Sequence, residues 1–115
     1  MSAPRVVVFA LAALAYCACS SAQRGEPLHG PLVLNAEQTH GEQLFMQYCN
    51  KCHPQGAGGL GPALNNKPLP GPAVRKQVRA GIGAMPAFDK QTISDPDLEA
   101  ISAYVLELHN PGGGR

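Results

Sequence analysis

The sequence predicts a small all-α domain of three to four short helices around a long irregular loop. Apolar residues recur at helical spacing in two segments, one starting near residue 35 and the other near residue 94. No run of alternating apolar and polar residues bounded by turns predicts a strand. Between the two segments, residues 54–72 contain five prolines and five glycines, too many breakers for a helix. Because so long a loop supplies few core side chains, we expect something other than protein side chains to fill the centre of the domain.

The first 22 residues are typical of a signal peptide. Arg5 gives a positive start, ten uninterrupted apolar residues follow at positions 6–15, and Ser20 and Ala22 are the small residues that precede a cleavage site. The apolar run is too short to span a bilayer as a permanent helix. We therefore expect an exported, periplasmic protein that is cleaved after Ala22.

A second interpretation of this segment is a lipoprotein signal. The tetrapeptide Leu14–Cys17 resembles a lipoprotein processing box, in which the signal ends before the cysteine and the cysteine is lipidated. A lipidated Cys17 would tether the protein to a membrane. After the signal we expect a linker at residues 23–34, a domain at residues 35–110 and a flexible tail at residues 111–115.

The charge balance argues against a nucleic-acid-binding protein. Removing residues 1–22 takes away one of the nine basic residues and none of the eight acidic ones, so the formal charge falls from +1 to zero. A nucleic-acid-binding domain would show a basic excess. The same cleavage leaves two of the four cysteines, Cys49 and Cys52.

The first two predicted helices have recognisable start and stop signals. The first begins at Asn35 or Thr39, either of which is a favourable cap. Its stripe at helical spacing consists of Gly41, Leu44, Phe45, Tyr48, Cys49 and Cys52. A short helix follows at residues 73–80, ended by Gly81, and a tight loop covers residues 81–92.

The last helix has the clearest start. Ser94 or Asp95 is its expected cap, Pro96 is favourable in a first turn, and the acidic residues there suit the positive end of the helix dipole. Its apolar stripe consists of Leu98, Ile101, Tyr104, Val105 and Leu108.

The segment QYCNKCHPQG at residues 47–56 contains a Cys-x-x-Cys-His motif formed by Cys49, Cys52 and His53. Structural zinc needs four ligands, usually as two separated pairs, and the chain has no second pair. A thioredoxin-like dithiol needs a βαβ context, which the sequence does not predict. A disulfide between the two cysteines would close only a four-residue loop and leave His53 without a role.

The motif is instead typical of covalent c-type haem attachment, and we expect one haem c with its iron at this position. Cysteines three residues apart on a helical turn project to the same side, so Cys49 and Cys52 can both reach the two vinyl groups of one porphyrin. The adjacent His53 would then face the iron as one axial ligand.

Met85 is the expected second axial ligand, because it lies 32 residues after His53 on a tight glycine-rich loop. Methionine ligation raises the reduction potential and suits electron transfer. Met46 lies on the same helix as the motif and cannot reach the opposite face of the ring. The other histidines, His29, His40 and His109, lie in the linker or at helix ends. Ordinary core filling is the alternative role for Met85.

Together these segments resemble the class I monohaem c-type cytochromes of bacteria, over about residues 35–109. The matching segments are GEQLFMQYCNKCH, GLGPALNN, GIGAMPAF and DLEAISAYVLEL. The resemblance implies a small cytochrome c fold with His53 and Met85 as axial ligands and Cys49 and Cys52 as thioether anchors.

The resemblance also implies roles for residues outside the ligand set. The carbonyl of Pro62 would accept the Nδ1–H of His53, which fixes the tautomer of that ligand. Leu64 would pack on the haem ring. The first helix would cross the last one near Gly41 and Tyr104, where glycine permits close approach.

We expect a one-electron carrier rather than an enzyme, because the chain offers no acid–base pair, nucleophile or open metal site. Its partners would be an electron donor and an electron acceptor among redox proteins, met by a monomer through an apolar rim formed by Ala57, Ala84, Ala87 and Phe88. Two alternatives remain. One is a c-type haem protein with a labile Met85 that binds a small ligand or reacts with peroxide. The other is a dedicated cytochrome subunit of a respiratory oxidase or dehydrogenase complex.

Overall fold

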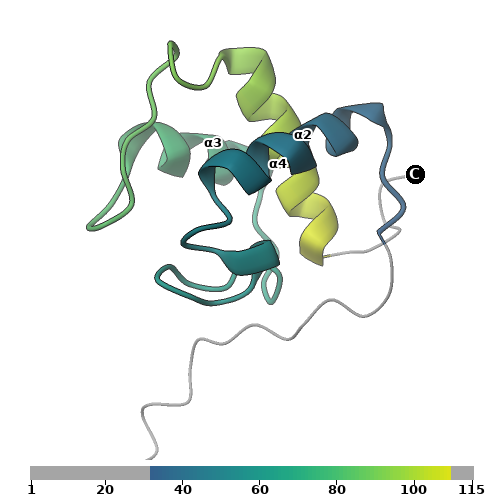
Figure 1. Ribbon diagram of the computed structural model, residues 1–115, viewed down its shortest axis with the longest axis horizontal. Coiled ribbons are helices and arrows are strands. Elements are labelled where there is room, and N and C mark those ends of the chain that lie inside the picture. The colour runs from purple at the N-terminus through teal and green to yellow at the C-terminus, as the bar shows by residue number, and fades with distance from the viewer. Residues whose placement is uncertain (1–31, 110–115) are drawn as a thin grey trace, which may run out of the picture.

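The computed structural model describes residues 32–109, and α-helices form the framework of this part of the chain (Figure 1). Within these residues there is no strand, and a single isolated bridge pairs Ile82 with Met85. The predicted all-α fold class is confirmed. The elements are α2 (Ala36–Tyr48), the 3₁₀ turn η2 (Pro54–Gly56), α3 (Gly71–Ala80) and α4 (Asp95–His109).

Several predictions concern residues outside the described range. These are the signal peptide at residues 1–22, the lipidation of Cys17, most of the linker and the tail at residues 111–115. Of the predicted linker, Leu32 and Leu34 are half-buried and pack against the hydrophobic core. Across residues 32–109, no helix has both the length and the apolar character needed to cross a membrane.

Helix α2 begins with a capping box. The Asn35 side chain accepts a hydrogen bond from the Gln38 N–H at 2.8 Å, and the Gln38 side chain accepts one from the Asn35 N–H at 2.9 Å. Asn35 is therefore the cap, and Thr39 lies inside the helix.

The expected continuation of this helix through Cys49 to Cys52 is wrong, because α2 ends at Tyr48. The carbonyl of Phe45 accepts hydrogen bonds from the N–H groups of both Cys49 and Asn50, at 2.8 and 2.9 Å. This shared acceptor closes the helix, and Cys52 follows on a separate turn.

Helices α3 and α4 also begin at identifiable signals. Helix α3 begins at Gly71, two residues earlier than expected, because Pro72 fits a first turn, where its missing N–H has no partner to lose. The carbonyl of Pro70 accepts the N–H of Val74 at 3.1 Å. Helix α4 begins directly after its cap, Ser94. The Ser94 hydroxyl accepts a hydrogen bond from the N–H of Asp97, the third residue of the helix, at 3.2 Å.

The core lies where α2 crosses α4 (Figure 1). A Cβ on Gly41 would overlap the backbone carbonyl of Ala100, so the two helices pack backbone against backbone at this point. The rings of Phe45 and Tyr104 meet edge to face beside it, with centroids 5.2 Å apart. The buried core cluster consists of Phe45, Val78, Ile93, Leu98, Ile101, Tyr104, Val105 and Leu108.

Candidate functional site

The Cys-x-x-Cys-His motif occupies one closed turn directly after α2. The carbonyl of Cys49 accepts hydrogen bonds from the N–H groups of Cys52 and His53, at 3.1 and 2.9 Å. The two cysteines therefore keep the spacing of a helical turn although the regular helix has ended. Both are half-buried, and they are not joined in a disulfide.

The environment of the Cys49 thiol favours uncharged sulfur. Burial, with a smaller contribution from Cys52, raises the pKa of the Cys49 thiol to about 11. Zinc binding requires the thiolate, whereas a thioether carries no charge and suits a desolvated position. In addition, no three His, Cys, Asp or Glu side chains gather into a metal-ion site within residues 32–109. The donor set thus fits covalent attachment to a porphyrin better than zinc.

His53 has a fixed orientation. The residue is 8% exposed, and its Nδ1 lies 2.8 Å from the carbonyl oxygen of Pro62. Because a carbonyl can only accept a hydrogen bond, Nδ1 carries the proton and Nε2 keeps the lone pair that a metal ligand needs. This is the contact that the resemblance implied for Pro62. The role of both residues toward an iron stays a prediction.

The loop at residues 56–65 folds back onto the motif and brings Pro62 to His53. The N–H of Gly61 donates to the carbonyl of Cys52 at 2.9 Å. Gly61 also packs directly against the imidazole, since a Cβ at this position would lie 2.8 Å from Nδ1 and 2.9 Å from Nε2. Sequence reasoning missed Gly61, whose only signal was its position immediately before Pro62.

Met85 lies in a tight turn that begins where α3 ends. Gly81 and Gly83 have φ angles of 64° and 55°, which glycine adopts without strain. Ile82 and Met85 exchange both of their backbone hydrogen bonds, at 3.1 and 2.9 Å. The turn therefore fixes the backbone at Met85, and the half-buried side chain packs against the core.

One ring contact relates the Met85 turn to the motif. The ring of Tyr48, which directly precedes the motif, meets the ring of Phe88 edge to face at 5.9 Å. Phe88 follows Met85 by three residues, so this contact brings the turn beside the motif. Cys49, Leu64 and Met85 are all half-buried side chains packed against the core cluster. Whether Leu64 touches a haem ring stays a prediction.

The residues expected to form an apolar rim differ in their exposure. Ala84 and Ala87 are exposed, whereas Ala57 and Phe88 are half-buried. Sequence reasoning missed two large exposed apolar side chains near these segments. Leu60 is 81% exposed immediately before Gly61, and Ile82 is 71% exposed in the Met85 turn.

The rival ligands have other environments. Met46 is 41% exposed on α2. The Nε2 of His40 lies 2.9 Å from a carboxylate oxygen of Asp97, and His109 is the last residue of α4. His29 lies outside the described residues.

Comparisons with known proteins agree with this site. Residues 36–105 match the family model for cytochrome C oxidase, cbb3-type, subunit III. Cytochrome c6 of Synechocystis sp. is 34% identical over 91 residues, which cover 72% of this chain and 75% of that protein. Cytochrome c6 of Cyanidium caldarium is 34% identical over 92 residues, covering 70% and 80%. The cytochrome c subunit of 4-cresol dehydrogenase (hydroxylating) of Pseudomonas putida is 34% identical over 82 residues, covering 71% and 72%.

The family match extends over the motif turn, the loop at residues 56–65 and the Met85 turn. The match and the identities to these relatives confirm the expected covalent haem c and the expected function in electron transfer, which requires redox partners. The chain therefore belongs to the c-type cytochromes, and its domain is of the family described by subunit III of cbb3-type cytochrome c oxidase.

Proposed function

We propose that this cytochrome is an exported one-electron carrier whose haem iron is bound by His53 and Met85. The observation that carries the ligand assignment is the hydrogen bond between His53 Nδ1 and the Pro62 carbonyl at 2.8 Å. It leaves Nε2 as the coordinating atom and holds the imidazole against rotation. Met85 supplies the only sulfur of the described residues, apart from the two motif cysteines and exposed Met46.

Each of these residues then has a separate role. Cys49 and Cys52 form the thioether links, and the free rotation of their side chains is lost once both bonds exist. The Gly61–Pro62 segment orients His53, and the glycine turn positions Met85 on the other side of the site. When bound, the haem supplies a one-electron redox couple. With protein ligands at both axial positions there is no open coordination site for a substrate, so we propose that the chain is not itself an enzyme.

Electron exchange would take place at the apolar rim. Leu60 directly precedes the Gly61–Pro62 segment that orients His53, and Ile82 lies in the Met85 turn. Both side chains are large and highly exposed. A small apolar surface suits the short-lived encounters that redox proteins make. A monomer that meets its donor and its acceptor in turn at this rim is the simplest arrangement.

The test is the optical spectrum of the oxidised holoprotein and its response to Met85→Ala. Wild type should show the far-red methionine–iron charge-transfer band, and Met85→Ala should abolish it and lower the reduction potential. Met46→Ala is the matched control and should change neither property, because Met46 is exposed on α2. High-spin wild-type iron, or a band that survives in Met85→Ala, would refute the assignment.

A second candidate function is that of a dedicated cytochrome subunit of a dehydrogenase. The 34% identity to the cytochrome c subunit of 4-cresol dehydrogenase supports it. Native purification followed by size-exclusion chromatography with light scattering separates the two cases. A monomer supports the free carrier, and a stoichiometric complex supports the subunit. Intact mass of the native protein tests export, since it reports cleavage after residue 22 or an acylated Cys17.

A further inference from the structure

We propose that Arg79 is a positioning residue for Met85: its guanidinium clamps the chain that follows Met85 onto the ends of α3 and α4. This inference rests on the proposed ligation by Met85. It extends that proposal by naming the group that determines how readily the methionine gives up its position to another ligand.

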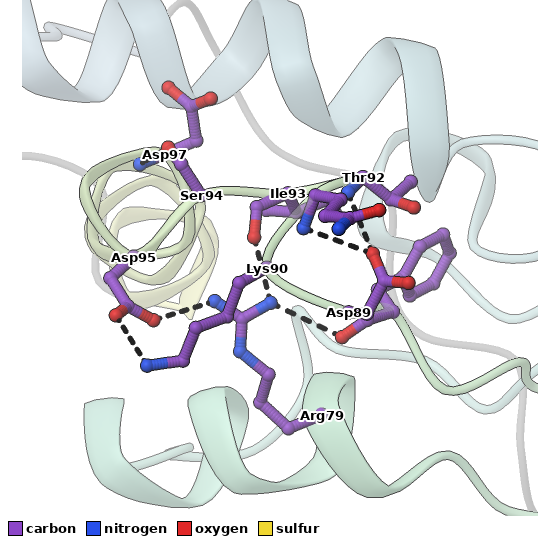
Figure 2. Close-up of polar contacts among 10 residues, drawn as sticks. Arg79, Asp89, Lys90, Thr92, Ile93, Ser94, Asp95 and Asp97 are labelled. Atoms are coloured by element: carbon purple, nitrogen blue, oxygen red, sulfur yellow. Dashed lines mark hydrogen bonds and ion pairs between the residues drawn. The ribbon is translucent and has the colours of Figure 1, made fainter.

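The guanidinium of Arg79 donates hydrogen bonds to acceptors on three different residues (Figure 2). Its Nη1 donates to the carbonyl of Ile93 at 2.7 Å and to the carbonyl of Phe88 at 3.2 Å. Its Nη2 donates to a carboxylate oxygen of Asp95 at 2.8 Å. The side chain is 24% exposed, so these bonds are partly shielded from water. A planar guanidinium with several fixed donors can hold such a set, whereas a single ammonium group cannot.

Two of these acceptors belong to the segment that carries Met85. Phe88 follows Met85 by three residues, and its own N–H donates to the carbonyl of Val78 at 2.9 Å. Both backbone groups of Phe88 are thus bonded to the last turn of α3. The N–H of Gly81 donates to the carbonyl of Gln77 at 2.8 Å at the other end of the turn. Residues 81 and 88 are therefore both tied to α3, and Met85 lies between the two ties.

The remaining polar contacts of this segment are mostly local. Asp89 accepts hydrogen bonds from the N–H groups of Gln91 and Thr92, at 3.0 and 2.8 Å, and Ile82 and Met85 bond to each other. Such contacts shape the loop without holding it to the helices. Lys90 binds Asp95 at 2.8 Å, but it is 73% exposed, and an exposed pair of this kind contributes little. Arg79 is thus the principal polar side-chain link between the loop and the helices.

The consequence is a control on ligand exchange. An added ligand such as imidazole binds only when Met85 has left the iron, so its apparent Kd equals its intrinsic Kd divided by the fraction of molecules in that state. Hydrogen bonds from a charged donor are stronger than neutral ones, and removal of the clamp removes two of them from the loop. We expect the fraction with displaced Met85 to rise about tenfold, which corresponds to about 1.4 kcal/mol.

The experiment is a titration of the oxidised holoprotein with imidazole, followed by loss of the far-red methionine–iron band. In Arg79→Met the apparent Kd for imidazole should fall about tenfold relative to wild type. Arg75→Met is the matched control, because Arg75 lies on the same helix and pairs with Glu99 at 3.0 Å without contacting the loop. It should leave the apparent Kd unchanged. Equal values for wild type and Arg79→Met, or equal falls in both variants, would overturn the proposal.

Two further variants separate clamping from charge and protect against a misfolded Arg79→Met. Arg79→Lys keeps the charge but has one donor nitrogen, so an intermediate apparent Kd is expected, and a wild-type value would overturn the proposal. Asp95→Asn keeps both carbonyl contacts of Arg79, so it should change the apparent Kd less than threefold or so. A change as large as that of Arg79→Met would assign the effect to the ion pair. If wild type lacks the far-red band, the ligation by Met85 fails, whereas a normal band with an unchanged Kd refutes Arg79 alone.

Discussion

Substitution of Gly61 by alanine tests the contact on which the orientation of His53 depends. The new Cβ would overlap Cε1 of His53 and would lie 2.8 Å from Nδ1 and 2.9 Å from Nε2, whereas ordinary contacts of a Cβ begin at about 3.4 Å. To restore an ordinary contact at its nearest atom, Cε1, the imidazole would have to move by about one ångström, which is enough to break its 2.8 Å hydrogen bond to the Pro62 carbonyl. The φ angle of Gly61 is not positive, so the alanine brings no backbone strain of its own.

The magnitude follows from these two effects. Overpacking of a well-packed site costs about 1–3 kcal/mol. The lost hydrogen bond of a buried histidine adds about 1 kcal/mol. We therefore expect Gly61→Ala to lower the free energy of unfolding by about 2–4 kcal/mol, a large part of the 5–15 kcal/mol typical of a domain. The reduction potential should rise, because an imidazole without this hydrogen bond donates less electron density to the oxidised iron.

The assay is urea unfolding of the holoprotein together with redox titration. Gly71→Ala is the matched control, since Gly71 is buried and the closest atoms to its Cβ would be side-chain ends, the Arg75 guanidinium at 3.0 Å and the Ser102 hydroxyl at 3.1 Å. Those atoms can shift, so the control should lose less than about 1 kcal/mol and keep its potential. If Gly61→Ala has the stability and potential of wild type, the imidazole is not held by this contact, and the reasoning fails.

Three further predictions concern the helices. Gly41→Ala should cost about 1–3 kcal/mol in urea unfolding, because its Cβ would overlap the Ala100 carbonyl and a backbone yields less than a side chain; an unchanged midpoint would contradict the close crossing. Hydrogen bonds, the largest from Lys90, hold the pKa of Asp95 below its ordinary value of 3.8. The carboxylate of Asp95 therefore contributes to stability above about pH 3.8, and this contribution is lost as the pH falls through the lower pKa of the folded state. In Asp95→Asn the unfolding midpoint should fall less steeply with decreasing pH than in wild type. The same acid dependence in both proteins would refute this. Burial raises the pKa of Tyr104 to about 12, so its contribution is complete below about pH 10 and lost as the pH rises toward 12. In Tyr104→Phe the unfolding midpoint should no longer fall for this reason above about pH 10. The same decrease at alkaline pH in both proteins would contradict the prediction.

Much of the fold could be predicted because its signals are local. The apolar stripe of α4 and the cap at Ser94 are spacings within one helix, and the structure confirms both. The end of α2 was misjudged because the stripe itself continues to Cys52. What ends the helix is competition for one acceptor, the Phe45 carbonyl, and hydrophobic spacing carries no information about it.

By itself, the sequence determined the chemistry of the site. Cys49, Cys52 and His53 lie within five residues, so their spacing alone predicted covalent haem attachment, and membership of the c-type cytochromes confirms it. The tertiary structure decided how these donors are held. The contact of Gly61 with His53 depends on how the loop at residues 56–65 folds back. The clamp by Arg79 depends on how the end of α3, the start of α4 and the loop between them pack together. Contacts of this kind join groups that are distant along the chain, and no pattern of neighbouring residues encodes the path that brings them together.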